Sequence, residues 1–153
     1  MTVTVYYWPP DWDTDSVGHA SIMVDGGQPP GQAYLSAWPG SLLSIILVGE
    51  GAYHEYRDDI ESENNRKPAA VVLRKLDESA IKEKMSDLKK RSYYSFVSAN
   101  CATQAGICLK AGVPLSALDT ALSLVAPQTA YLTNINSPWT LYGYAKLLAL
   151  KYA

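Results

Sequence analysis

The sequence contains few of the groups on which several common protein functions depend. Its 153 residues include two cysteines, two histidines and one phenylalanine, and the formal net charge is −2 at pH 7. A chain without an excess of positive charge has no electrostatic field that attracts nucleic acid or an anionic membrane. The sequence also contains no glycine-rich phosphate loop and no cysteine and histidine spacing typical of zinc sites. We therefore predict no nucleic-acid partner, no metal and no cofactor.

Long apolar runs are missing as well. A membrane-spanning helix needs about 18 consecutive apolar residues. The longest candidate, residues 42–48, is interrupted by Ser44 and ended by Gly49. Residues 1–5 lack the basic and apolar regions of a secretory signal. We expect no transmembrane segment, and a location either in the cytoplasm or outside it after export by a dedicated secretion system or a fused partner.

The two cysteines are not expected to form a disulfide. Cys101 and Cys108 are seven residues apart in one predicted helix, which places their Cα atoms about 10.5 Å apart. A disulfide tolerates at most about 7 Å between Cα atoms. Two free thiols suit a reducing compartment, and they leave Cys101 available for chemistry.

Charged residues are distributed unevenly along the chain. Residues 1–54 contain five acidic residues and no lysine or arginine, whereas residues 55–91 hold 19 of the 28 charged residues. Residues 92–153 contain four charges, so we expect this last third to be largely buried or covered by a partner. No repeat or linker is visible, and the length suits one domain over residues 1–153.

The pattern of residue types predicts an α+β fold. Segments rich in β-branched and aromatic residues predict four strands, at residues 3–8, 18–24, 33–38 and 69–73. Helices are predicted at residues 78–91, 101–111, 116–125 and 138–151, with Asp77, Asn100 and Ser137 as N-caps and Gly112 in a C′ position. A turn is predicted over residues 25–31. Three or four helices packed against a small antiparallel sheet form an α+β domain.

Cys101 occupies the position in which a nucleophilic cysteine is expected. It lies in the first turn of the predicted helix 101–111, where unsatisfied N–H groups and the helix dipole favour a thiolate. The same N–H groups can stabilise an oxyanion that forms beside the sulfur. A small buried apolar role, like that expected for Cys108, fits the same position. The cysteine alone does not decide between the two.

A thiolate nucleophile needs a base, and the chain offers His19 and His54. His54 lies in a charged stretch and is expected on the surface. His19 follows Gly18, which leaves room for an approaching group, and it lies near the start of a predicted strand. Its alternative role is that of a half-buried strand residue whose imidazole bonds to a backbone carbonyl.

The predicted strand pairing places polar and aromatic partners beside His19. If Val24 pairs with Ala33, then His19 faces Trp38 and lies diagonal to Ser36, on one side of the sheet. In that register Ser36 can orient the imidazole and Trp38 can shield it from water.

These motifs together resemble the circularly permuted papain-like superfamily. The matching segments are a histidine at a strand start (residues 18–21), a following strand (residues 34–39) and a cysteine at a helix start (residues 100–103). The superfamily includes permuted NlpC-type amidases, relatives of lecithin:retinol acyltransferase, and bacterial effectors that acylate lysine. The resemblance covers roughly residues 2–112. It implies a permuted papain-like fold in which Cys101 is the nucleophile and His19 the general base.

The resemblance leaves the third catalytic residue open. Ser36 matches it by strand position, and Glu50 or Asp58 can serve instead, because some relatives place an acid between the histidine and the cysteine. Asn100 and Trp38 are expected to support the site.

The predicted function is a cysteine-dependent acyl hydrolase of the amidase or peptidase type, acting on a peptide, amide or acyl substrate. One alternative is an acyltransferase that modifies a protein or lipid amine, with residues 92–153 forming its acyl groove. The other is an inactive binding module in which Cys101 and His19 are remnants. Domains that resemble this superfamily also occur as toxin or effector modules. For a toxin module, the resemblance implies an immunity protein as a partner.

Overall fold

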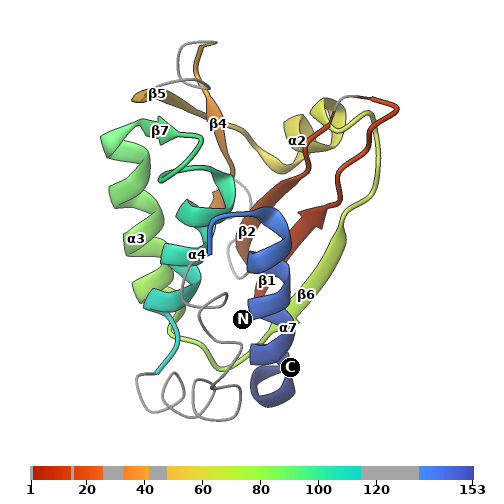
Figure 1. Ribbon diagram of the computed structural model, residues 1–153. Helices are drawn as coiled ribbons and strands as arrows, with labels where there is room; N and C mark the ends of the chain where they lie inside the picture. Colours follow the sequence, from red (N-terminus) through yellow and green to blue (C-terminus); the bar gives the residue numbers. More distant parts are fainter. Residues whose placement is uncertain (1, 15, 26–32, 42–47, 115–134) are drawn as a thin grey trace.

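The computed structural model describes residues 2–14, 16–25, 33–41, 48–114 and 135–153. Among these residues the chain forms two small antiparallel sheets and four helices (Figure 1). The predicted α+β class is confirmed, although the sequence predicted one sheet rather than two. The predicted helix 116–125 and most of the predicted turn 25–31 lie outside the described residues.

The larger sheet carries the first half of the predicted site. Its strand order is β3-β2-β1-β6, with all neighbours antiparallel: β1 (Thr2–Trp8), β2 (His19–Asp25), β3 (Ala33–Leu35) and β6 (Ala69–Leu73). The register pairs Val24 with Ala33, as predicted. The side chains that alternate along β2 therefore fall on the predicted faces, with Ile22 toward the core and His19 on the opposite side.

The smaller sheet corrects the prediction for residues 33–38. It has the order β4-β5-β7, with β4 (Ala37–Pro39), β5 (Val48–Tyr53) and β7 (Tyr93–Ser95). The single predicted strand is wrong, because the chain leaves β2 at Ser36 and then pairs with β5. The Ser36 carbonyl accepts the N–H of His54 at 3.1 Å, which begins the new pairing. Neither β5 nor β7 was predicted, since β5 contains two glycines and β7 has three residues.

Three of the helices begin and end within one residue of the prediction. They are α3 (Glu78–Arg91), α4 (Cys101–Ala111) and α7 (Pro138–Tyr152). The predicted caps are confirmed, since Asp77, Asn100 and Ser137 each accept the N–H of the residue three positions later. The fourth helix, α2 (Tyr56–Ser62), was not predicted, because its seven residues are mostly polar and give no apolar stripe.

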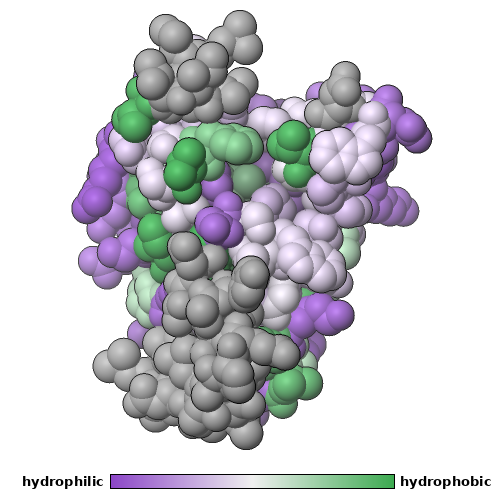
Figure 2. Space-filling view, viewed as in Figure 1, coloured by the Kyte–Doolittle hydropathy of each residue, from purple (hydrophilic) through white to green (hydrophobic). Residues whose placement is uncertain are grey.

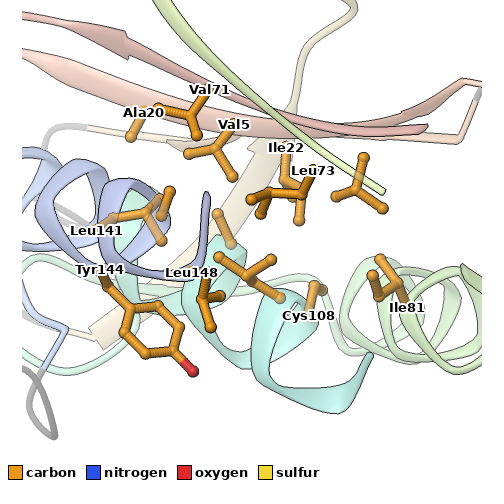
Figure 3. Packing of buried hydrophobic residues seen from close by; sticks show 14 of the residues in the cluster. Val5, Ala20, Ile22, Val71, Leu73, Ile81, Cys108, Leu141, Tyr144 and Leu148 are labelled. Atoms are coloured by element: carbon orange, nitrogen blue, oxygen red, sulfur yellow. The ribbon is translucent and has the colours of Figure 1, made fainter. Parts of the chain in front are cut away.

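The hydrophobic core lies between the larger sheet and helices α3, α4 and α7. Figure 3 shows Val5 and Ile22 of the sheet facing Leu141 and Leu148 of α7, with Cys108 of α4 nearby. On the opposite face of the sheet lies α2. This face is identified by the rings of Tyr6 in β1 and Tyr56 in α2, whose centroids are 4.9 Å apart. The sheet is thus covered on both sides, and α2 is held over the face that carries His19.

Glycine is required at position 112 because of close packing, not because of the backbone conformation at the end of the helix. Gly112 is the C-cap of α4, one position earlier than predicted, and its φ of −90° is open to any residue. A Cβ at this position lies 2.4 Å from Ile81 Cδ1 and 2.9 Å from the carbonyl oxygen of Asp77. Because the backbone of Asp77 cannot easily move aside, we expect Gly112→Ala to lower the free energy of unfolding by roughly 1–3 kcal/mol in urea denaturation.

The control for this prediction is Gly143→Ala in α7. A Cβ at Gly143 meets nothing within 4 Å, so this change should raise the free energy of unfolding by roughly 0.5–1 kcal/mol. A Gly112→Ala protein as stable as the wild type would contradict the packing explanation.

The described part of the last third is only partly buried. Leu141, Ala145 and Leu148 of α7 lie in the core, but Phe96, Val97 and Trp139 are at least half exposed. The prediction that this region is largely buried is confirmed for the inner faces of its described helices, and the alternative that a partner covers the exposed side chains stays a prediction. None of the described helices has the length and apolar character needed to cross a membrane.

Candidate active site

His19 begins β2 and is almost fully buried. Its ring stacks on Trp38 with a centroid separation of 4.4 Å, and Trp8 lies 5.5 Å away on another side. The preceding Gly18 has φ +88°, and a Cβ there would lie 3.0 Å from the Trp8 carbonyl oxygen. Glycine is required here because both the left-handed backbone and the close approach exclude a side chain. The predicted neighbourhood of His19 and Trp38 is present, although Trp38 belongs to β4.

Ser36 lies against the imidazole, as the register predicted. Its Oγ is 2.9 Å from His19 Nε2, and the residue is completely buried. The Ser36 hydroxyl donates to Asp59 Oδ1 at 2.8 Å. With its own proton committed to Asp59, the Ser36 oxygen accepts the Nε2–H of His19. Ser36 therefore fixes the orientation of the ring and favours the tautomer that carries its proton on Nε2.

Asp59 is the centre of the site, and the sequence did not predict it. It is fully buried and accepts hydrogen bonds from four side chains: Tyr34 Oη, Ser36 Oγ at 2.8 Å, Trp38 Nε1 at 2.8 Å and His19 Nε2 at 3.2 Å. Burial alone would raise the pKa of Asp59. The hydrogen bond and positive charge of His19 outweigh burial and, with the bonds from Tyr34 and Ser36, lower this pKa below its ordinary value.

The two acids that the sequence offered as third residue lie elsewhere. Asp58 is exposed, and its carboxylate accepts the N–H of Glu55 at 2.9 Å to cap α2. Glu50 is exposed on β5, where it pairs with Tyr93 of β7. Both proposals for the third residue are therefore wrong in geometry. The residue types do not mark Asp59, because it and Asp58 are adjacent acids and only the orientation of α2 buries one of them.

Cys101 is the first residue of α4, as predicted. The N-cap Asn100 accepts the Thr103 N–H at 3.0 Å, and its amide donates to the carbonyl oxygens of Phe96 and Asn136. Both amide protons of Asn100 are thus committed to backbone, so this residue holds the helix start in place and is not itself an oxyanion donor. Cys101 is 8% exposed, and the described chain pairs neither of its cysteines in a disulfide.

The imidazole of His19 interacts with the thiol of Cys101 through a side-chain hydrogen bond and through charge. Burial would lower the pKa of His19, but the charge of Cys101, hydrogen bonds to Asp59 and Cys101, and the charge of Asp59 together raise it to about 10. His19 is therefore protonated at neutral pH, between an anionic carboxylate and the sulfur. By contrast, burial among apolar groups raises the pKa of Cys108 to about 12, which keeps that thiol neutral and inert.

His54 is part of the same cluster, contrary to the prediction of a surface residue. Its ring stacks on Trp38 with centroids 5.1 Å apart, and its Nδ1 lies 3.6 Å from Asp59 Oδ1. The side chain is about one third exposed. Sequence reasoning missed it because the position depends on how β5 turns into α2.

Comparisons with known proteins gave no match to a family model, to a curated sequence or to a solved structure. Within the part of the chain that the structure describes, no group of three or more histidine, cysteine, aspartate or glutamate residues is arranged so that it could hold a metal ion.

Proposed function

We propose that the chain is a cysteine-dependent acyl hydrolase of the amidase or peptidase type, built as a permuted papain-like domain over residues 1–153. One observation carries the proposal. A buried imidazole, His19, contacts the Cys101 thiol at a helix start while its Nε2 is held by Ser36 and Asp59. Such an arrangement of nucleophile, base and orienting acid is that of nucleophilic acyl transfer.

The hydrogen bonds of the His19 imidazole indicate which of its two nitrogens takes part in the reaction. Because Nε2 bonds to Ser36 and Asp59, Nδ1 is the nitrogen that exchanges a proton with the thiol. The Cys101 sulfur attacks the substrate carbonyl carbon and forms a C–S bond. His19 then gives its proton to the leaving amine as the C–N bond breaks. Water, deprotonated by His19, attacks the thioester, which releases a carboxylic acid and restores the thiol.

Backbone groups at the start of α4 suit the oxyanion of this reaction. The Thr103 N–H is bonded to the Asn100 side chain, and the Gln104 N–H to the Asn100 carbonyl. The first-turn N–H groups of Cys101 and Ala102 have no partner within a helix and point toward its N-terminal end. They support a negative oxygen that forms beside the sulfur.

The proposal predicts a covalent acyl-enzyme on Cys101. The protein is incubated with a panel of peptide amides, esters and thioesters, quenched in acid and analysed by mass spectrometry. We expect an added acyl mass that maps to Cys101 and is removed by hydroxylamine. Cys108→Ala, on the same helix, should form the adduct and turn over, whereas Cys101→Ala should do neither. An adduct on Cys108, or turnover by Cys101→Ala, would contradict the proposal.

Acyl transfer to an amine is the second candidate, and one observation favours it. Exposed apolar side chains flank the nucleophile: Phe96 and Val97 precede α4, and Trp139 lies in the first turn of α7. The hydrogen bond from Asn100 to Asn136 joins the starts of these two helices. Figure 2 shows hydrophobic side chains, in green, at the surface in the upper part of this face of the molecule. Adding a lysine peptide to the acyl-enzyme separates the candidates, because transfer yields acyl-lysine and hydrolysis yields free acid.

A further inference from the structure

The structure assigns a role to His54: we propose that it is a positioning residue that shares Asp59 with His19, so that its charge controls how firmly the general base is held. The inference rests on the proposed function for its kinetic consequence. The coupling itself, between two imidazoles and one carboxylate, is a property of the fold. It goes beyond the triad, which needs one histidine.

The imidazoles of His19 and His54 both stack on the indole of Trp38, and both lie close to the carboxylate of Asp59. Trp38 stacks on His19 at 4.4 Å and on His54 at 5.1 Å, so the two imidazole centroids are less than about 10 Å apart. Asp59 Oδ2 is bonded to His19 Nε2, while Oδ1 lies 3.6 Å from His54 Nδ1. The indole N–H donates to that same Oδ1 at 2.8 Å. A change in the charge of His54 therefore acts directly on the Asp59 carboxylate, which orients His19.

The surroundings of the Nδ1 atom of His54 favour an interaction with Asp59 when the imidazole carries a proton. This nitrogen is buried and has no hydrogen-bond partner, and the separation of 3.6 Å from Asp59 is too long for a good hydrogen bond. Protonation turns this contact into an ion pair and draws Asp59 Oδ1 toward His54. The backbone limits the movement of His54, because its N–H is bonded to the Ser36 carbonyl. Asp59 from α2 is the one charged group paired with His54 in the described chain, and His19 from β2 is the titratable group across Trp38.

The size of the coupling follows from Coulomb's law. Two positive charges less than about 10 Å apart at an effective dielectric constant of about 20 change each other's proton affinity by roughly tenfold. A proton on His54 therefore weakens the hold of Asp59 on the His19 imidazolium. When His54 carries a proton, we expect this weaker hold to lower kcat and to leave KM unchanged.

The test is a pH titration followed by NMR of the histidine side chains. The chain has two histidines, so the imidazole signals of both can be assigned without ambiguity. In the wild type we expect the His19 signals to shift together with those of His54 as the pH is lowered, although His19 keeps its proton. In His54→Gln this shift should vanish. An unchanged His19 trace in His54→Gln would overturn the inference.

A second variant separates charge from packing. His54→Phe keeps a ring on Trp38 but removes the nitrogen atoms, and we expect it to behave like His54→Gln. If His54→Phe restores the wild-type His19 titration, the role is one of stacking and the inference is wrong. In kinetic assays the wild type should lose between about twofold and tenfold in kcat from pH 8 to pH 5 relative to His54→Gln. Coupled NMR signals in a protein without acyl cleavage would support this inference and contradict the proposed function.

Discussion

Replacing Asp59 by asparagine should lower kcat by about 10²–10⁴-fold and flatten the pH dependence of stability. Asparagine fills the same space but has no charge. Its amide oxygen can accept one hydrogen bond from Nε2–H, whereas its NH2 group can only donate. The imidazole then keeps the charge of Cys101, the largest cause of its raised pKa, but loses the hydrogen bond and charge of Asp59, which also raise this pKa and orient the ring. Turnover of the best substrate from the acyl-enzyme panel measures the kinetic loss.

The sign of the stability effect follows from the two pKa shifts. The raised pKa of His19 means that its contribution is complete below about pH 6.5 and is lost as the pH rises through about 10. The lowered pKa of Asp59 means that its contribution is present above the ordinary carboxylate range and is lost as the pH falls through the lower folded value. Wild-type stability should therefore fall between pH 6.5 and pH 10.

Urea denaturation at pH 6.5 and pH 9 checks this expectation. We expect the wild type to lose roughly 2–3 kcal/mol of unfolding free energy over this range, and Asp59→Asn to lose less, because only the contributions of Asp59 to the raised pKa of His19 are removed. The Asp58→Asn variant is a matched control, because the neighbouring carboxylate is exposed and lies outside the cluster. Parallel pH profiles for the wild type and Asp59→Asn would contradict the assignment of Asp59 as the partner of His19.

The second large effect is expected for His19→Gln. Glutamine can donate a hydrogen bond to Ser36 or Asp59, which protects the buried carboxylate from losing every partner at this position. It cannot exchange a proton with the thiol. We expect a loss of about 10²–10⁴-fold in kcat, the usual contribution of general acid and base catalysis, measured with the same substrate. Asp58→Asn, at an exposed acid outside the cluster, is the control and should retain most of the activity. Wild-type turnover by His19→Gln would exclude His19 as the base.

The sequence was sufficient for those parts of the fold that depend on local signals. Asn100 caps α4 and Ser137 caps α7 because a short polar side chain can bond to the N–H three residues later wherever it occurs. The pairing of Val24 with Ala33 could also be predicted from the sequence, because one register puts the apolar side chains of both strands on one face. That register alone predicts that Ser36 lies beside His19.

The centre of the site depended on information that is not local. Asp59 and Asp58 are adjacent in a charged stretch, and only the orientation of α2 decides which of them is buried. That orientation is set by the contact between Tyr56 and Tyr6, which are far apart in sequence. His54 depends in the same way on the chain leaving the larger sheet at Ser36. Such long-range packing cannot be inferred from residue spacing alone.

The rate of Cys101 alkylation by iodoacetamide at pH 6 most directly tests the contact between thiol and imidazole. The modified peptide is quantified by mass spectrometry in the wild type and in His19→Gln, with Cys108 as the internal reference. We predict fast labelling of Cys101 in the wild type, at least tenfold slower labelling in His19→Gln, and no labelling of folded Cys108. Equal rates at Cys101 in the two proteins would show that the imidazole does not activate the sulfur.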